Sequence, residues 1–234
     1  MTKFSKADLG RIVNSYTDFR GVNLNIDLHS DENGNFDYKS YVEAQTRVNV
    51  KKVHSEGGDG PVFNRIEMVA NYIKKHIPDA ASGICHGTRR GTEQRDFKKL
   101  LNIPVIGTEI SHTAEAFPDT IQWDFHEVKE EWLGSASFIF SNSLDHSYDP
   151  IKCLNAWMSC VTDDGKIFLQ RGQDDLPEQQ FGAPRRSPAD MFQATAEAFE
   201  KIVALAGTDA WIIKYPEELK INNGKRIVVL ERKK

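Results

Sequence analysis

The feature that most constrains the fold is a regular alternation of helix-like and strand-like segments from residue 61 onward. Apolar residues recur at helical spacing over 62–73, and a short strand leads into Cys85. Further strands are expected at 104–110, 120–125, 136–142 and 166–170. Strands that alternate with helices form a parallel sheet with helices on both faces. The sequence therefore predicts a Rossmann-like, doubly wound α/β domain.

The last part of this pattern differs, because two strand-like segments follow one another without a helix between them. They are AWIIKY (210–215) and RIVVLER (226–232), and a short connection of this kind joins antiparallel strands. Ser187, Pro188 and Asp190 predict the start of a long helix that runs to Gly207, with Phe192 on its buried face. The Asp164-Gly165 pair predicts a turn before the strand at 166–170.

Residues 1–60 are less regular and are expected to form a helical extension, with residues 61–234 as the main domain. A helix is predicted at 6–16, and the glycine-rich 55–60 segment, SEGGDG, is the candidate boundary. A second helix is expected from a set of apolar side chains that share a face: Tyr38, Tyr41, Val42, Ala44 and Val48. Aromatic residues of this extension either cover a pocket or pack on the sheet domain.

Composition narrows the class of protein. The chain of 234 residues has a formal net charge of −4, which disfavours but does not exclude a nucleic-acid partner. We expect no membrane span, because no apolar run is long enough, and the polar N-terminus does not resemble a signal peptide. Three cysteines without a CxxC pair favour a cytoplasmic location, and the sequence shows no metal-ligating cluster. It does not indicate an oligomeric state.

The segment SGICHGTRRGTE (82–93) is expected to be a strand, a glycine turn and the first turn of a helix. Gly87 and Gly91 permit backbone angles that a Cβ disfavours and allow another group to approach the main chain. The N–H groups of the next helix would suit the polar end of a nucleotide-like ligand. An ordinary strand-to-helix turn explains the same glycines.

Polar residues stand just beyond the ends of several predicted strands. Glu109 and Asp124 end two of them, and the segment 141–146 follows a third. In an open α/β sheet this edge is where ligands bind. Glu109 lies roughly 20 residues beyond the glycine turn, the spacing at which a carboxylate meets ribose hydroxyls. The alternative is that both carboxylates are solvated or cap a turn.

Residues 61–234 resemble the class I S-adenosylmethionine-dependent methyltransferases. The most specific part is IFSNSLDHSYDPIKCLNAWMSCVTDDGKIFL (139–169), which is similar to the fourth strand, following helix and fifth strand of that family. Leu144-Asp145-His146 stands where many members have Leu-Glu-His. The resemblance implies a seven-stranded sheet with an antiparallel last strand and S-adenosyl-L-methionine as cofactor. It also implies methyl transfer to an acceptor, expected to be a small molecule, that the sequence does not identify.

The resemblance also implies cofactor-binding residues, with departures from the family pattern. The acid and three alternate glycines of the first motif correspond to Cys85, Gly87, Arg89 and Gly91, so the acid is a cysteine and the middle glycine an arginine. Glu109 matches the ribose-binding acid and Asp124 the residue that meets the adenine amino group. The remaining expected contacts are His86, Thr88, Ile110, Phe125 and Asn142.

Catalysis would need the acceptor to be held in line with the methyl group, with a general base where the acceptor carries a proton. His146 is the first candidate and Asp145 the second, although a structural role for His146 also fits. Arg89 and Arg90 either reach an anionic substrate or form surface pairs. The long segment 171–186 either closes over the acceptor, with Arg185 and Arg186 as anion ligands, or is a surface loop.

Two other functions remain open at this level. The altered glycine turn is compatible with a non-catalytic binding or scaffold protein that keeps the fold. A nicotinamide dinucleotide enzyme is the other alternative, but Gly87, Arg89 and Gly91 do not provide its GxGxxG turn.

Overall fold

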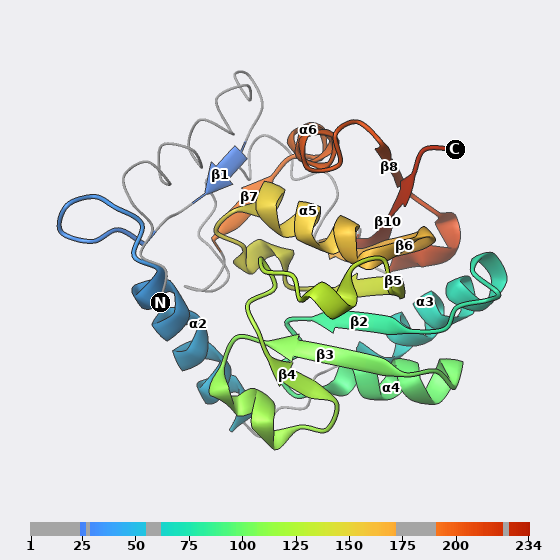
Figure 1. Cartoon of the computed structure of the whole chain (residues 1–234), viewed down its shortest axis with the longest axis horizontal. Coiled ribbons are helices and arrows are strands. Elements are labelled where there is room, and N and C mark those ends of the chain that lie inside the picture. Colours follow the sequence, from blue (N-terminus) through green and yellow to red (C-terminus); the bar gives the residue numbers. More distant parts are fainter. Residues whose placement is uncertain (1–23, 27–28, 55–61, 172–190, 222–224) are drawn as a thin grey trace.

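A computed structural model describes residues 24–26, 29–54, 62–171, 191–221 and 225–234. Its central sheet has the strand order β4-β3-β2-β5-β6-β10-β8 (Figure 1). The strands are β2 (Gly83–His86), β3 (Val105–Glu109), β4 (Thr120–Gln122), β5 (Ala136–Ser141), β6 (Val161–Arg171), β8 (Trp211–Lys214) and β10 (Lys225–Arg232), and the short β9 (Lys220–Ile221) pairs with β10. The predicted seven-stranded sheet is therefore confirmed, with the two-residue β9 as an additional strand.

Strand direction also follows the prediction. The pairs β2–β3, β2–β5, β3–β4 and β5–β6 are parallel, whereas β10 is antiparallel to both β6 and β8. β10 thus lies between its neighbours instead of at the edge of the sheet. Because β2 is flanked by β3 and β5, the chain reverses its direction of winding at β2, and a crevice is expected at the carboxyl ends of these strands.

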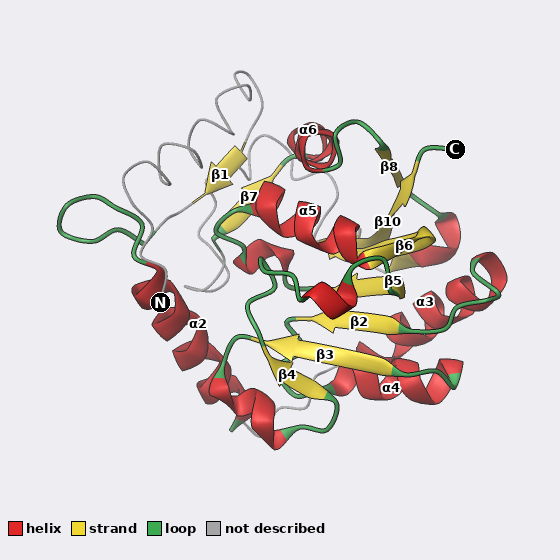
Figure 2. Cartoon of the chain, viewed as in Figure 1, coloured by secondary structure: helices red, strands yellow, loops and turns green. Residues whose placement is uncertain are grey.

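Helices cover both faces of the sheet (Figure 2). α3 (Val62–His76) and α4 (Thr92–Leu101) pack on one face, and α5 (Pro150–Cys160) and α6 (Ala196–Ala206) on the other. The alternation of side chains along β5 shows the division, since Phe138 and Phe140 join the first layer and Ile139 the second. Short 3-10 turns, η2 (His112–Ala116), η3 (Glu130–Trp132), η4 (Leu144–His146) and η6 (Glu217–Leu219), complete the connections.

Helix starts explain why two of these elements begin where they do. Asp149 accepts a hydrogen bond from the Lys152 amide at 3.0 Å, and Pro150 occupies the first turn of α5. Thr195 caps α6 in the same way through the Ala198 amide, and Gly207 ends that helix as predicted.

Two local predictions were wrong. Residues 192–194 are not the start of the long helix but form β7 (Phe192–Ala194), which pairs antiparallel with β1 (Leu24–Ile26). A distant partner strand supplies backbone hydrogen bonds that local capping signals cannot predict. The turn expected at Asp164-Gly165 lies inside β6, where the register against β5 shifts between Ala136 and Phe138. The chain bulges there and continues as one strand.

The N-terminal part includes one long helix, α2 (Tyr38–Val53), which lies across the carboxyl ends of the parallel strands (Figure 1). Asp37 begins it by accepting hydrogen bonds from the Ser40 amide and hydroxyl. The predicted helix at 6–16, the boundary at 55–60 and the helix-start residues 187–190 lie outside the described residues. No helix among the described residues is long and apolar enough to cross a membrane.

Candidate functional site

The glycine turn adopts the strained conformation that its sequence requires. Gly87, Arg89 and Gly91 all have positive φ values, of 72°, 45° and 69°. A Cβ on Gly87 would lie 2.6 Å from the Ser143 side chain, and one on Gly91 would lie 2.7 Å from Gln94 Nε2. Arg89 therefore takes a left-handed conformation that costs a non-glycine residue about 1–2 kcal/mol. Strain of this kind is concentrated at functional sites.

Glu109 ends β3 beside this turn and is almost completely buried, with 2% of its surface exposed. Its Oε1 accepts hydrogen bonds from Asn49 Nδ2 at 2.6 Å and from the Ser111 amide at 2.9 Å. Its Oε2 accepts one from the Arg89 amide at 3.1 Å. Burial raises the pKa of Glu109, and these donors and the Arg89 charge only partly offset that effect. Burial thus disfavours the ionised form of this carboxylate. Three of its roughly four acceptor positions are occupied, which leaves about one for a ligand.

Asp124 follows β4 and is held on both oxygens. Oδ1 accepts from the His126 amide at 3.0 Å and lies 2.6 Å from His126 Nδ1, and Oδ2 accepts from the Tyr38 hydroxyl at 2.7 Å. Burial acts to raise the pKa of Asp124, but His126 and the Tyr38 hydrogen bond outweigh it and hold the pKa at about 2. Asp124 is therefore ionised at neutral pH.

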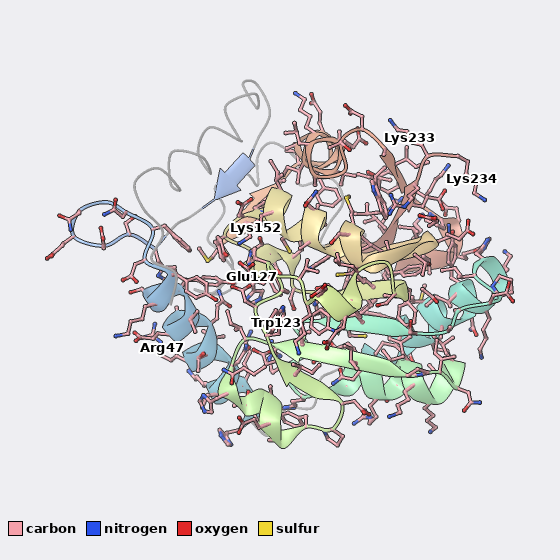
Figure 3. The ribbon with its side chains drawn as sticks, in the orientation of Figure 1. Arg47, Trp123, Glu127, Lys152, Lys233 and Lys234 are labelled. Carbon is pink, nitrogen blue, oxygen red and sulfur yellow. The ribbon has the colours of Figure 1, made fainter. Side chains whose placement is uncertain are left out.

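His126 connects this carboxylate to the core. Its Nε2 lies 2.7 Å from Ser147 Oγ, and its ring stacks on Tyr148 with centroids 3.8 Å apart. Ser147 is fully buried, so the Asp124–His126–Ser147 chain positions Asp124 and does not present a nucleophile. Sequence reasoning missed His126, although the Asp-Phe-His spacing was a usable signal. A neighbouring pair, Lys152 and Glu127, ties the same loop to α5 (Figure 3).

A small cavity of about 30 Å³ lies between these carboxylates and α2. Among the predicted cofactor contacts, six line it: Gly87, Arg89, Glu109, Ile110, Asp124 and Phe125. His146, the first candidate base, lines it too. The other lining residues are Tyr41, Gln45, Asn49 and Ser143. The structure thus brings the glycine turn and both carboxylates to one hollow.

The remaining predicted contacts lie elsewhere. Cys85 is buried in the layer under α3 and α4, and burial raises the pKa of its thiol. His86 faces the other layer, where it stacks on Trp157 with centroids 4.8 Å apart, and burial lowers its pKa to about 3. The Asn142 amide donates to Glu93 at 3.3 Å instead of lining the cavity.

Thr88 and Gly91 also stay outside the cavity wall. The Thr88 amide donates to the Thr108 carbonyl, and Gly91 precedes the first turn of α4. Both residues shape the turn through the main chain. The expected contacts of Arg185 and Arg186 lie outside the described residues.

α2 contributes a row of buried side chains at intervals of four residues, Tyr41, Gln45 and Asn49. Tyr41 belongs to the predicted helical face, but Gln45 and Asn49 were missed because polar residues on a helix usually face solvent. Gln45 Oε1 lies 2.7 Å from His146 Nδ1. Asn49 contacts both Glu109 and Arg89, since its Oδ1 accepts from Arg89 Nε at 3.4 Å. The buried polar face of α2 therefore matches the polar groups of the site.

The two arginines of the glycine turn both contact α2. Besides the Arg89–Asn49 contact, Arg90 Nη2 donates to the carbonyls of Lys52 and Val53, the latter at 3.1 Å. These carbonyls belong to the end of α2, where carbonyl groups lack the i+4 amide donors of the helix interior. Asp145, the second catalytic candidate, is half exposed, and its Oδ1 lies 3.9 Å from His146 Nε2.

Comparison with known proteins identifies the fold through solved structures and not through sequence. No protein-family model matches the chain, and no curated protein matches its sequence. Among solved structures, 1,6-didemethyltoxoflavin-N1-methyltransferase of Burkholderia thailandensis, with bound 1,6-didemethyltoxoflavin and S-adenosylhomocysteine, superposes with a TM-score of 0.61 at 12% identity, over 90% of this chain and 94% of that one. The chain has the class I methyltransferase fold.

Other structures with the class I methyltransferase fold agree. The plantazolicin methyltransferase BpumL, in complex with a pentazolic desmethylPZN analog and S-adenosylhomocysteine, has a TM-score of 0.59 at 13% identity, covering 84% of this chain and 98% of that one. The sugar N-methyltransferase KedS8 from Streptoalloteichus has a TM-score of 0.57 at 13% identity, covering 76% and 90%. The predicted fold is confirmed at this level.

Proposed function

We propose that this chain is an S-adenosylmethionine-dependent methyltransferase that acts on a small-molecule acceptor. The observation that carries the proposal is a pair of carboxylates, the buried Glu109 and Asp124 with 8% of its side chain exposed, on the carboxyl edge of a class I methyltransferase fold. A ribose diol offers two hydroxyl donors and an adenine amino group offers another, which suits acceptor-only groups. Ile110 and Phe125 contribute apolar side chains to the wall of the same cavity.

The residues fit the nucleoside half of the cofactor better than its amino-acid half. Glu109 would take the ribose and Asp124 the adenine amino group. On the other half, Cys85 lies in the core, so the family's acid that faces the ammonium group is missing at that position. Gly87 and the strained Arg89 would offer main-chain contacts there. The cofactor, when bound, would supply an electrophilic methyl group on a sulfonium centre.

His146 is the residue we propose as general base. The amide oxygen of Gln45 lies 2.7 Å from Nδ1, so we propose the tautomer in which Nδ1 donates to Gln45 and Nε2 carries the lone pair. A neutral imidazole in this tautomer can remove a proton from an acceptor hydroxyl or ammonium group. The methyl donor and the base would then share one hollow.

We further propose that residues 1–60 form a cap over the acceptor site and residues 61–234 the cofactor-binding domain. The contacts of α2 with Glu109, Asp124 and His146 support this division. Three proteins with the same fold are a 1,6-didemethyltoxoflavin N1-methyltransferase, a sugar N-methyltransferase and a plantazolicin methyltransferase. The three cysteines are free thiols, as in a protein of the reducing cytoplasm.

Calorimetry tests the proposal. S-adenosylmethionine and S-adenosylhomocysteine should bind with a stoichiometry of one, and NAD should not bind. A screen for methyl transfer to hydroxylated and aminated small molecules then identifies the acceptor. Binding of NAD alone would contradict the proposal.

A second candidate function has one observation in its favour. Because Cys85 provides no charge to an ammonium group, a non-catalytic protein that binds only the nucleoside half fits the same site. Such a protein would bind adenosine as tightly as S-adenosylhomocysteine, whereas a methyltransferase should bind S-adenosylhomocysteine more tightly. The same calorimeter distinguishes the two.

A further inference from the structure

Helix α2 makes hydrogen bonds at the positions where a nucleoside would make them. The Asn49 amide donates to Glu109 Oε1 at 2.6 Å, and the Tyr38 hydroxyl donates to Asp124 Oδ2 at 2.7 Å. Burial and the nearby Asp124 charge raise the pKa of Tyr38, so its hydroxyl keeps its proton and acts as a donor. Both carboxylates of the proposed cofactor site therefore already receive a donor from the same helix.

The acceptor capacity of Glu109 decides whether a ribose can bind beside Asn49. A carboxylate offers about four lone-pair positions. Asn49 Nδ2, the Ser111 amide and the Arg89 amide occupy three of them. A ribose diol brings two donors, so one position is too few. The Ser111 and Arg89 amides are fixed in the main chain beside the carboxylate, which leaves Asn49 as the donor that must be displaced.

The available space leads to the same conclusion. The cavity between α2 and the carboxylates measures about 30 Å³. That volume corresponds to about one water molecule, whereas pockets for small ligands measure about 300 Å³ or more. Tyr41, Gln45 and Asn49 of α2 form one wall of it. A nucleoside therefore enters only if this wall moves away from the sheet.

The glycine turn holds α2 in this position. Arg89 Nε donates to Asn49 Oδ1, and Arg90 binds the carbonyls at the end of the helix. The arginine at the position of the middle glycine thus has a contact that glycine cannot make. The same turn would contact the cofactor, so ligand and helix share one set of main-chain and side-chain groups.

We propose that α2 is a built-in competitor of the cofactor, in which Asn49 and Tyr38 take the places of the ribose and adenine donors. Cofactor binding displaces Asn49 from Glu109, releases its contact with Arg89 and shifts α2 outward. The proposal rests on the proposed function, because it takes Glu109 and Asp124 as cofactor ligands. It predicts that weakening the Asn49 contact favours the ligand.

The first test is the affinity and association rate of S-adenosylhomocysteine for Asn49→Ala. Loss of a hydrogen bond to a charged group should make binding about 10- to 100-fold tighter, mainly through faster association. Lys51→Ala is the matched control, since Lys51 is exposed on the same helix and should leave binding unchanged. Weaker binding by Asn49→Ala would make Asn49 a ligand contact and overturn the proposal.

The second test measures the position of α2 directly. Arg47 lies on the outer face of α2 (Figure 3), Lys99 is exposed on α4, and the native cysteines are buried, so Arg47→Cys and Lys99→Cys accept spin labels selectively. The distance between the labels should shift on saturation with S-adenosylhomocysteine. An unchanged distance with saturated ligand overturns this inference alone. If neither wild type nor Asn49→Ala binds the ligand, the proposed function fails as well.

Discussion

The two halves of the carboxyl edge are held together by different forces. At β3 and β4 the structure relies on hydrogen bonds to two carboxylates, the buried Glu109 and the nearly buried Asp124, each of which accepts three. At β2 and β5 it relies on close packing, since Gly87 abuts Ser143 and Asn142 turns toward Glu93. The sequence resemblance predicted the two carboxylates of the charged half, and Cys85 and Arg89 in the β2 turn are where the sequence departs from that resemblance. Substitutions should therefore act on affinity in one half and on stability in the other.

The largest effect should come from Gly87→Ala in the packed half. The new Cβ would lie 2.6 Å from Ser143 on a backbone with φ of 72°, so strain and overpacking together should cost about 3 kcal/mol of unfolding free energy. Urea denaturation measures this loss. Gly134→Ala is the matched control, because its φ is 58° but nothing lies within 4 Å of the added Cβ. Equal losses in the two variants would show that packing against Ser143 is unimportant.

Glu109→Ala should produce the largest effect on binding in the charged half. Removal of a charge-assisted contact to the ribose should weaken S-adenosylhomocysteine about 10- to 100-fold by calorimetry. Glu115→Ala, at an exposed carboxylate in η2, should leave the affinity unchanged. An unaltered affinity for Glu109→Ala would remove Glu109 from the proposed site.

Asp124→Asn should reveal a pH-dependent contribution to stability. The pKa of Asp124 in the folded protein, about 2, lies below the ordinary value of 3.8, so its ionised form favours folding. This contribution is present above pH 4 and is lost as pH falls from about 4 to about 2. The variant should be less stable than wild type by about 2 kcal/mol at neutral pH, with the difference vanishing near pH 2. A difference that is constant with pH would show that shape and not charge matters.

The smallest effect should follow Arg89→Gly. Glycine relieves the left-handed strain but loses the contact with Asn49, so the unfolding free energy should change by less than about 1 kcal/mol. Chemical denaturation gives this value beside that of Gly87→Ala. A loss as large as that of Gly87→Ala would mean that Arg89 is a main support of the turn.

Local sequence signals predicted the sheet well because its strands are short, buried and separated by clear helices. The parallel order and the antiparallel β10 followed from the alternation and from the missing helix between the last two strands. Glu109 and Asp124 were identifiable because one ends β3 and the other closely follows β4. Their place in the chain was a local signal, whereas their partners Asn49 and Tyr38 lie far away in sequence.

The remaining features depend on contacts between segments far apart in sequence. Phe192 pairs with Ile26, so a strand formed where helix signals predominate. Asn49 reaches Glu109 across the cavity, and no local pattern marks a buried asparagine on an otherwise polar helix. His126 escaped notice because its partner Ser147 belongs to a different strand-end loop.

The ladder between Leu24 and Ala194 has a consequence for synthesis on the ribosome. The first strand of the described chain emerges early, yet its partner is translated about 10 s or more later. Until then β1 lacks its partner strand β7, while the segments that form β2 to β6 can already assemble. The N-terminal strand is thus set in place as one of the last steps of folding.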